Sequence, residues 1–136
     1  MSQITQVILY TGSDGRARFR EDLLPLDSSN PMVKLSAISS ASGLQWRHSP
    51  VGFQSEVHVS SEPQWVFVLS GIMEIGLLDG SSRQFGPGEH FYSGDTLPEN
   101  TTFDSGIHGH RSRQVGEEPL VTLFVKEART DKSEPR

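Results

Sequence analysis

The chain has 136 residues, enough for one domain with a hydrophobic core, and it has no cysteine, which excludes disulfide bonds, thiolate metal sites and cysteine nucleophiles. Twelve basic residues against 17 acidic ones give a net charge of −5, and without a basic cluster we expect no nucleic-acid partner. No apolar stretch is long enough to cross a bilayer, and residues 1–6 lack the basic start of a signal peptide. We therefore predict a cytoplasmic, soluble domain with no membrane partner.

Short apolar runs between frequent turns predict an all-β chain. Glycine occurs 13 times and proline eight times, so few segments of helix length escape a break. In chain order, we expect strands at residues 6–10, 16–20, 32–39, 44–48, 53–60, 65–69, 72–78, 82–85, 89–93, 108–115 and 120–126. The clearest alternation of apolar and polar residues lies in 53–60, whereas 65–69 is apolar throughout, as in a strand buried on both faces.

Many short strands joined by tight turns favour an antiparallel double-sheet jelly-roll barrel, because closure protects the edges of the sheets. We predict a single domain over residues 1–126, with N-terminal strands in 1–50 and the barrel core in 51–125. Residues 127–136 are charged and have no apolar anchor, so we expect a flexible tail.

The spacing of glycines and histidines resembles the motifs of the cupin superfamily, in particular its small single-domain members. The first cupin motif reads Gly-x5-His-x-His-x3-Glu-x6-Gly, and the chain matches it with Gly52, His58, Ser60, Gln64 and Gly71. The second motif reads Gly-x5-Pro-x-Gly-x2-His-x3-Asn. Gly88 stands at its start, and His110 and Gln114 stand at its end. His110 follows Gly88 by 22 residues instead of 11, so the loop before it holds about eleven additional residues.

The resemblance implies one divalent metal, which cupins commonly hold with two histidines and a glutamate of the first motif and a histidine of the second. This chain keeps His58 and His110 but has serine and glutamine at the other two positions, and both are weaker ligands. His108 lies two residues from His110, so in a strand both would point to one face and replace the missing histidine. The predicted metal site is His58, Gln64, His108 and His110, with iron, zinc, nickel, manganese or copper as the metal. The alternative is that these histidines bind no metal.

Three further residues are predicted to bind substrate. Glu56 falls on the same strand face as His58 and could supply a carboxylate or a hydrogen bond that orients the imidazole. Asp95, just after a predicted strand, is another candidate for that role, and His48 could line the barrel mouth as a general acid or base. The long loop, residues 97–107, is predicted to flank the mouth, because loops of excess length are often lids.

A polar barrel interior predicts a small-molecule site. The resemblance favours a metal-dependent enzyme acting on a small polar metabolite, with dioxygenase or other oxidoreductase chemistry ahead of isomerase or lyase chemistry. The alternative is a non-catalytic barrel that holds a sugar or an organic acid. A third reading is an interaction module, since residues 65–69 are apolar and residues 1–35 could be exchanged with a partner. We expect a homodimer.

Overall fold

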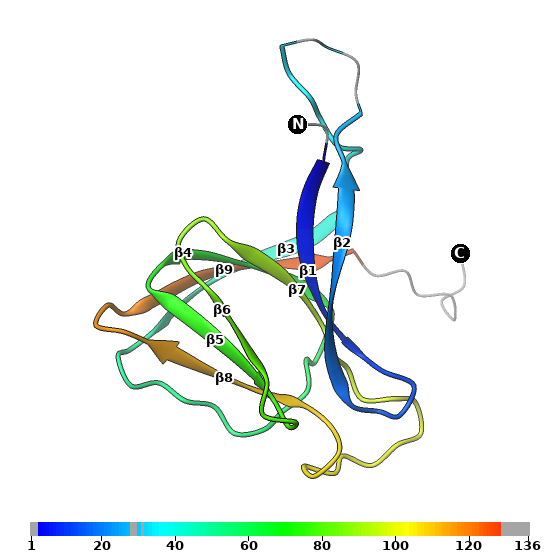
Figure 1. The fold of residues 1–136 in the computed structure, drawn as a ribbon, viewed down its shortest axis with the longest axis vertical. Coiled ribbons are helices and arrows are strands. Elements are labelled where there is room, and N and C mark those ends of the chain that lie inside the picture. Colours follow the sequence, from blue (N-terminus) through cyan, green and yellow to red (C-terminus); the bar gives the residue numbers. More distant parts are fainter. Residues whose placement is uncertain (1–2, 28–29, 31, 129–136) are drawn as a thin grey trace.

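The computed structural model describes residues 3–27, 30 and 32–128, and in this part of the chain the regular elements are nine strands (Figure 1). They are β1 (Gln3–Thr11), β2 (Ala17–Pro25), β3 (Ala41–Ser49), β4 (Gln64–Ser70), β5 (Ile72–Leu77), β6 (Ser82–Phe85), β7 (His90–Gly94), β8 (His110–Val115) and β9 (Leu120–Glu127). None of the described residues forms a helix, so the all-β prediction is confirmed. The described part accordingly has no long apolar helix of the kind that crosses a membrane.

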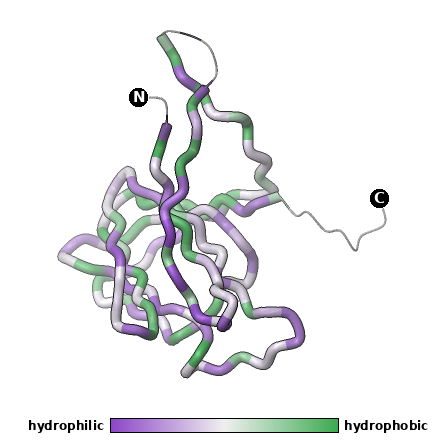
Figure 2. Tube along the Cα trace, turned by 45° about the vertical axis from the view of Figure 1, so that its right-hand side comes forward, coloured by the Kyte–Doolittle hydropathy of each residue, from purple (hydrophilic) through white to green (hydrophobic). Residues whose placement is uncertain are grey.

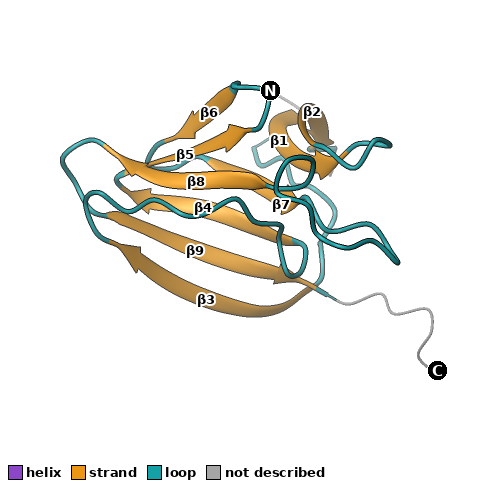
Figure 3. Cartoon of the chain, turned by 90° about the horizontal axis from the view of Figure 1, so that it is seen from below, coloured by secondary structure: helices purple, strands orange, loops and turns teal. Residues whose placement is uncertain are grey.

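The strands form two sheets that face each other (Figure 3). The larger has six strands in the order β2-β1-β7-β4-β9-β3, and the smaller has three in the order β6-β5-β8. Pairing is antiparallel except between β1 and β7, which run parallel. This arrangement confirms the predicted double-sheet, jelly-roll class.

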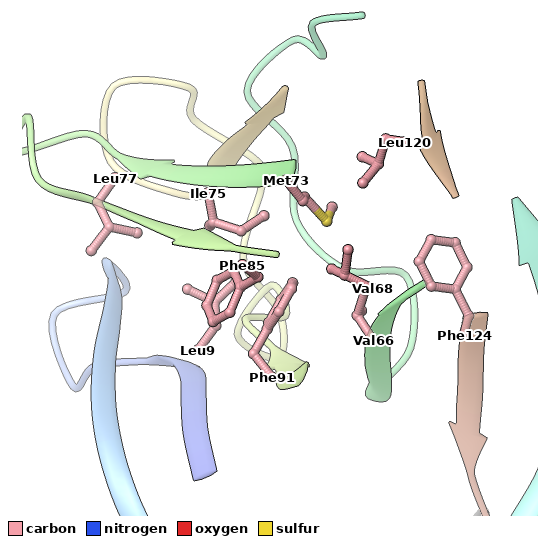
Figure 4. Packing of buried hydrophobic residues seen from close by; sticks show 10 residues of the cluster. All are labelled: Leu9, Val66, Val68, Met73, Ile75, Leu77, Phe85, Phe91, Leu120 and Phe124. Atoms are coloured by element: carbon pink, nitrogen blue, oxygen red, sulfur yellow. The ribbon is translucent and has the colours of Figure 1, made fainter. Parts of the chain in front are cut away.

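The core lies between the two sheets, where alternate residues of each strand point inward. Every second residue of β5 is buried, and the same period appears in β7 and β9. The buried apolar cluster, shown in Figure 4, is Leu9, Val66, Val68, Met73, Ile75, Leu77, Phe85, Phe91, Leu120 and Phe124. Phe85 of the small sheet stacks on Phe91 of the large sheet with ring centroids 4.5 Å apart, so aromatic packing joins the two layers.

Two predicted strands are wrong. Residues 32–39 have no strand in their described part, and Met32 and Ile38 are 88% and 99% exposed, so no partner strand holds them. Residues 53–60 alternate but run alongside β8 with only two isolated bridges, at Gln54 and His58. The last strand, β9, ends at Glu127. The predicted tail lies outside the described residues from 129 onward.

Candidate functional site

A cavity of about 190 Å³ opens within the barrel, lined by residues of both sheets and of the segment before β4. One part of its wall is apolar, with Val66 and Phe91 from the large sheet and Met73 and Ile75 from the small one. The polar part consists of Arg47, His58, Ser60, Ser61, Gln64, Ser93, His110 and Ser112. Convergent polar groups against an apolar wall are typical of small-molecule sites.

His58 and His110 lie side by side in this wall because their backbones pair. The amide of each donates to the carbonyl of the other at 2.9 Å, which makes them directly opposed residues of an antiparallel bridge. Opposed residues place their side chains on the same face, and the two ring centroids are 4.7 Å apart. The sequence prediction that brought these two histidines together agrees with this geometry.

The ring of His110 is fixed by a buried carboxylate. Its Nδ1 lies 2.8 Å from Oδ2 of Asp95, and the Thr11 hydroxyl lies 2.8 Å from Oδ1 of the same residue. His110 is 3% exposed and Asp95 is 0% exposed, so solvent does not compete with this contact. A carboxylate can only accept a hydrogen bond, so Nδ1 carries the hydrogen of the imidazole and donates it, and Nε2 is the nitrogen available to a ligand.

The ring of His58 is fixed in the same tautomer by the main chain. Its Nδ1 lies 2.8 Å from the carbonyl oxygen of Glu56, which can only accept, so Nδ1 donates and Nε2 remains available. Burial lowers the pKa of His58, and the neighbouring His110 and Arg47 also lower it, while the hydrogen bond to Glu56 opposes them. His58 therefore favours the neutral form, with a lone pair on Nε2.

The donors present do not fit the metal set implied by the cupin resemblance. Oε1 of Gln64 accepts a hydrogen bond from Lys126 Nζ at 2.6 Å, so this amide is already engaged. The Ser60 hydroxyl, at the position of the second family histidine, lies 2.7 Å from that of Ser93. Across the residues described, His, Asp and Glu side chains form no cluster of three or more that could hold a metal ion. The cavity offers two imidazoles and no carboxylate, and metal binding stays a prediction.

His108 does not share a face with His110. It precedes β8, and the glycine between the two histidines has a φ of 95°, which breaks the alternation expected of an extended strand. Nδ1 of His108 accepts a hydrogen bond from the amide of Asp104 at 2.9 Å, and a side-chain atom added at Gly15 would lie 3.2 Å from its ring. His108 is buried in this turn and is not part of the cavity wall.

The three residues predicted to bind substrate have other positions. His48 follows the cavity residue Arg47 in β3, so it points to the opposite, outer face of the sheet. The Glu56 side chain is exposed, and only its carbonyl oxygen acts on the site, through His58. Asp95 lies behind His110 and does not line the cavity. The Glu56 carbonyl and the Asp95 carboxylate thus orient the two imidazoles, the orienting role that the sequence suggested for the side chains of both residues.

Arg47 is the cavity residue that sequence reasoning missed. Its guanidinium lies over the ring of Phe53, 4.7 Å from the centroid, and 6.0 Å from that of Phe124. The sequence contains no signal for it, because alternation in β3 does not say whether Trp46 or Arg47 faces inward.

The long loop contributes no residue to the cavity wall. It packs against the turn between β1 and β2, where Arg16 donates to the carbonyl oxygen of Gly106 at 3.4 Å and Gly15 approaches Ile107. The lid predicted for residues 97–107 therefore receives no support from these contacts.

Comparison with known proteins identifies a structural neighbour. No family model matches the chain, and no curated protein matches it either. One matching solved structure is the cupin domain of Cnp3 from Schizosaccharomyces pombe, with 14% identity and a TM-score of 0.47, over 96% of this chain and 86% of that one.

Proposed function

We propose that the chain binds a small polar molecule in the barrel cavity, with Nε2 of His58 and Nε2 of His110 as the central contacts. One observation carries the proposal: two imidazoles line one cavity, and each has its Nδ1 engaged on the side of the protein. A ring nitrogen fixed in this way presents a defined acceptor, or a donor when protonated, to whatever enters the cavity.

The arrangement around His110 supports a ligand-binding role more than a purely structural one. A buried aspartate is costly unless its oxygens are paired, and both oxygens of Asp95 are paired, one with Thr11 and one with His110. A core serving stability alone could replace these groups with apolar residues of similar volume. The polar network instead fixes one ring nitrogen at the wall of a cavity.

The second candidate function is proton transfer on the bound molecule, as in isomerase or lyase chemistry without a metal. The specific observation is the pairing of Asp95 with His110, because a carboxylate at Nδ1 orients the imidazole and fixes which nitrogen faces the cavity. His58, whose lowered pKa favours the neutral ring, lies beside it, so Nε2 of either ring can take a proton from one atom of the bound molecule and return it to another. Oxidative chemistry needs a redox-active group, for which the donor set described above is not suited, so it is not part of the proposal.

Ligand titration followed by NMR of the histidine rings tests the proposal. A panel of acetate, acetamide, glycerol, lactate and glucose is titrated into the protein, and the ring signals are assigned with the His58→Ala and His110→Ala variants. We expect at least one compound to shift both rings saturably, and each variant to abolish that binding. His48→Ala is the matched control, since this ring lies on the outer face of the same sheet. Shifts confined to His48 or His90, or no saturable shift with any compound, would contradict the proposal.

A further inference from the structure

The electrostatic character of the cavity is opposite to that of the whole chain. The protein carries a net charge of −5, yet the ionisable residues that line the cavity are Arg47, His58 and His110, with no aspartate or glutamate among the lining residues. Asp95, the nearest carboxylate to these rings in the hydrogen-bond network, is 0% exposed and has both oxygens engaged. The cavity therefore presents the positive charge of Arg47 without a carboxylate in its lining.

Arg47 is positioned for this role by two aromatic rings. Its guanidinium lies over Phe53 and is also near Phe124, so its plane is supported without loss of its hydrogen-bonding edge. In the part of the chain that the structure describes, none of the ion pairs includes Arg47, whereas Arg18, Arg20, Arg83 and Arg113 each contact a carboxylate. The charge of Arg47 also contributes to the lowered pKa of His58, in keeping with its place in the same wall.

We propose that Arg47 makes the cavity selective for anions and that the ligand is a small organic carboxylate. This inference rests on the proposed function, since it names the ligand class of the same site. The carboxylate binds the fork of the guanidinium, and its polar substituents reach Nε2 of His58 or His110. Val66, Phe91 and Ile75 form the apolar wall, which suits a carbon skeleton and disfavours a fully hydrated inorganic anion.

The test compares acetate with acetamide, which have nearly the same shape but differ in charge. The titrations are followed by NMR of the two histidine rings at a pH of about 8, above the ordinary pKa of histidine, so that Arg47 supplies the charge. We expect acetate to bind at least about tenfold more tightly than acetamide, a difference of about 1.4 kcal/mol. Inorganic phosphate is added as a second anion and should bind more weakly than acetate.

Variants of Arg47 complete the test. Arg47→Gln should abolish the preference for acetate over acetamide, and Arg47→Lys should retain part of it, because the charge remains but the planar fork is lost. Arg113→Gln is the matched control, since Arg113 follows the cavity residue Ser112 in β8, points to the outer face and pairs with Glu74 at 2.7 Å. Thermal unfolding checks that Arg47→Gln still folds after losing its aromatic contacts, and Arg47→Lys serves if it does not.

The outcomes separate the two proposals. If acetate and acetamide shift the rings equally in the wild type, or if both Arg47 variants keep the preference for acetate, the anion inference is overturned and the proposed function stands. If phosphate binds more tightly than acetate, the site selects anions but not organic carboxylates, which overturns the ligand class. If neither compound binds while glycerol or glucose does, the anion inference fails alone. If no compound in the panel binds, both proposals fail.

Discussion

Nδ1 of His110 lies 2.8 Å from a carboxylate oxygen of Asp95, in a part of the barrel where neither residue is more than 3% exposed. The two residues are 15 positions apart, at the end of the β7 segment and the start of β8. This contact determines which nitrogen of His110 faces the cavity, so it links the fold to the chemistry of the site.

We predict that Asp95→Asn changes the tautomer of His110. An amide can offer its NH₂ group to Nδ1, which would move the imidazole proton to Nε2 and remove the acceptor from the cavity. The loss of a buried charge-assisted hydrogen bond should also lower the free energy of unfolding by about 1.5–3 kcal/mol. Nitrogen-15 NMR of the ring reports the tautomer, and urea unfolding reports the stability. Asp22→Asn, on an exposed ion pair with Arg20, is the control, and an unchanged His110 spectrum in Asp95→Asn would contradict the prediction.

The turn before β8 gives a second prediction. Gly109 has a φ of 95°, and a Cβ atom there would lie 2.7 Å from the carbonyl oxygen of His58. Gly109→Ala should therefore cost about 1–3 kcal/mol of stability and displace His58 from His110.

Gly80→Ala separates backbone strain from that steric clash. Gly80 has a φ of 93°, but nothing lies within 4 Å of an added Cβ. We expect it to show the cost of the positive φ alone and to leave the signals of both rings unchanged. Equal losses of stability in the two variants would show that contact with His58 contributes nothing.

The local pattern of the sequence predicts the strands well where one face of the strand is buried in the core. The residues of β5, β7 and β9 alternate between buried and less buried positions because each strand faces the core with one side. Alternation fails for residues 53–60 because a period of two does not say whether a partner strand is within reach. There the chain runs beside the edge of β8 and forms only separate hydrogen bonds with it; for example, the amide of Ser55 donates to the carbonyl oxygen of Ser112.

The candidate site was predictable only in part. The family spacing leads to His58 and His110, which the structure places side by side. Strand alternation leads to His108 as well, and it fails there because the positive φ at Gly109 breaks the alternation. Arg47 belongs to no motif. Its place in the cavity depends on which face of β3 turns inward and on the rings of Phe53 and Phe124, which contact its guanidinium.

Elemental analysis decides the metal prediction. Since the described donors amount to two imidazoles and Gln64 is engaged by Lys126, we expect clearly less than one equivalent of metal in protein purified without a histidine tag or chelator. Lys126→Met is informative because it releases the Gln64 amide, and it should raise the metal content if a third ligand is what the site lacks. One equivalent of a transition metal in the wild type, lost in both His58→Ala and His110→Ala, would contradict our expectation and restore the metal site.

His90 should make stability depend on pH. The His90 ring stacks on that of Phe67 with centroids 5.2 Å apart, and Nε2 of Gln6 lies 3.1 Å from Nε2 of His90. Burial lowers the pKa of His90 below the ordinary 6.5. The unfolded chain then binds a proton more readily than the folded one, so His90 stabilises the fold above about pH 6.5, and this contribution is lost as the pH falls through the folded pKa. Urea unfolding of the wild type and His90→Gln at about pH 7.5 and about pH 5 should show a smaller loss on acidification in the variant. An equal loss in both proteins would contradict the role of His90.

The outer face of the large sheet gives the last prediction, that of a homodimer. Register places Trp46, Leu123 and Phe67 side by side across β3, β9 and β4, and Trp46 is 65% exposed. The connection between β2 and β3, at the top of Figure 1, exposes Met32 and Ile38, and hydrophobic positions are visible there in Figure 2. Each copy thus carries both an apolar face and an apolar segment that the described residues leave exposed, so two copies can cover each other.

Light scattering after size-exclusion chromatography measures the mass in solution. We expect a dimer for the wild type and a monomer for Trp46→Ser, because a large exposed aromatic residue in an apolar face contributes strongly to association. Ile38→Ser should weaken the dimer if the connection is the covering element, whereas Val51→Ser, at an exposed apolar residue of a loop, should leave it intact. A monomeric wild type, or a dimer unaffected by both Trp46→Ser and Ile38→Ser, would show that this face is not where the copies meet.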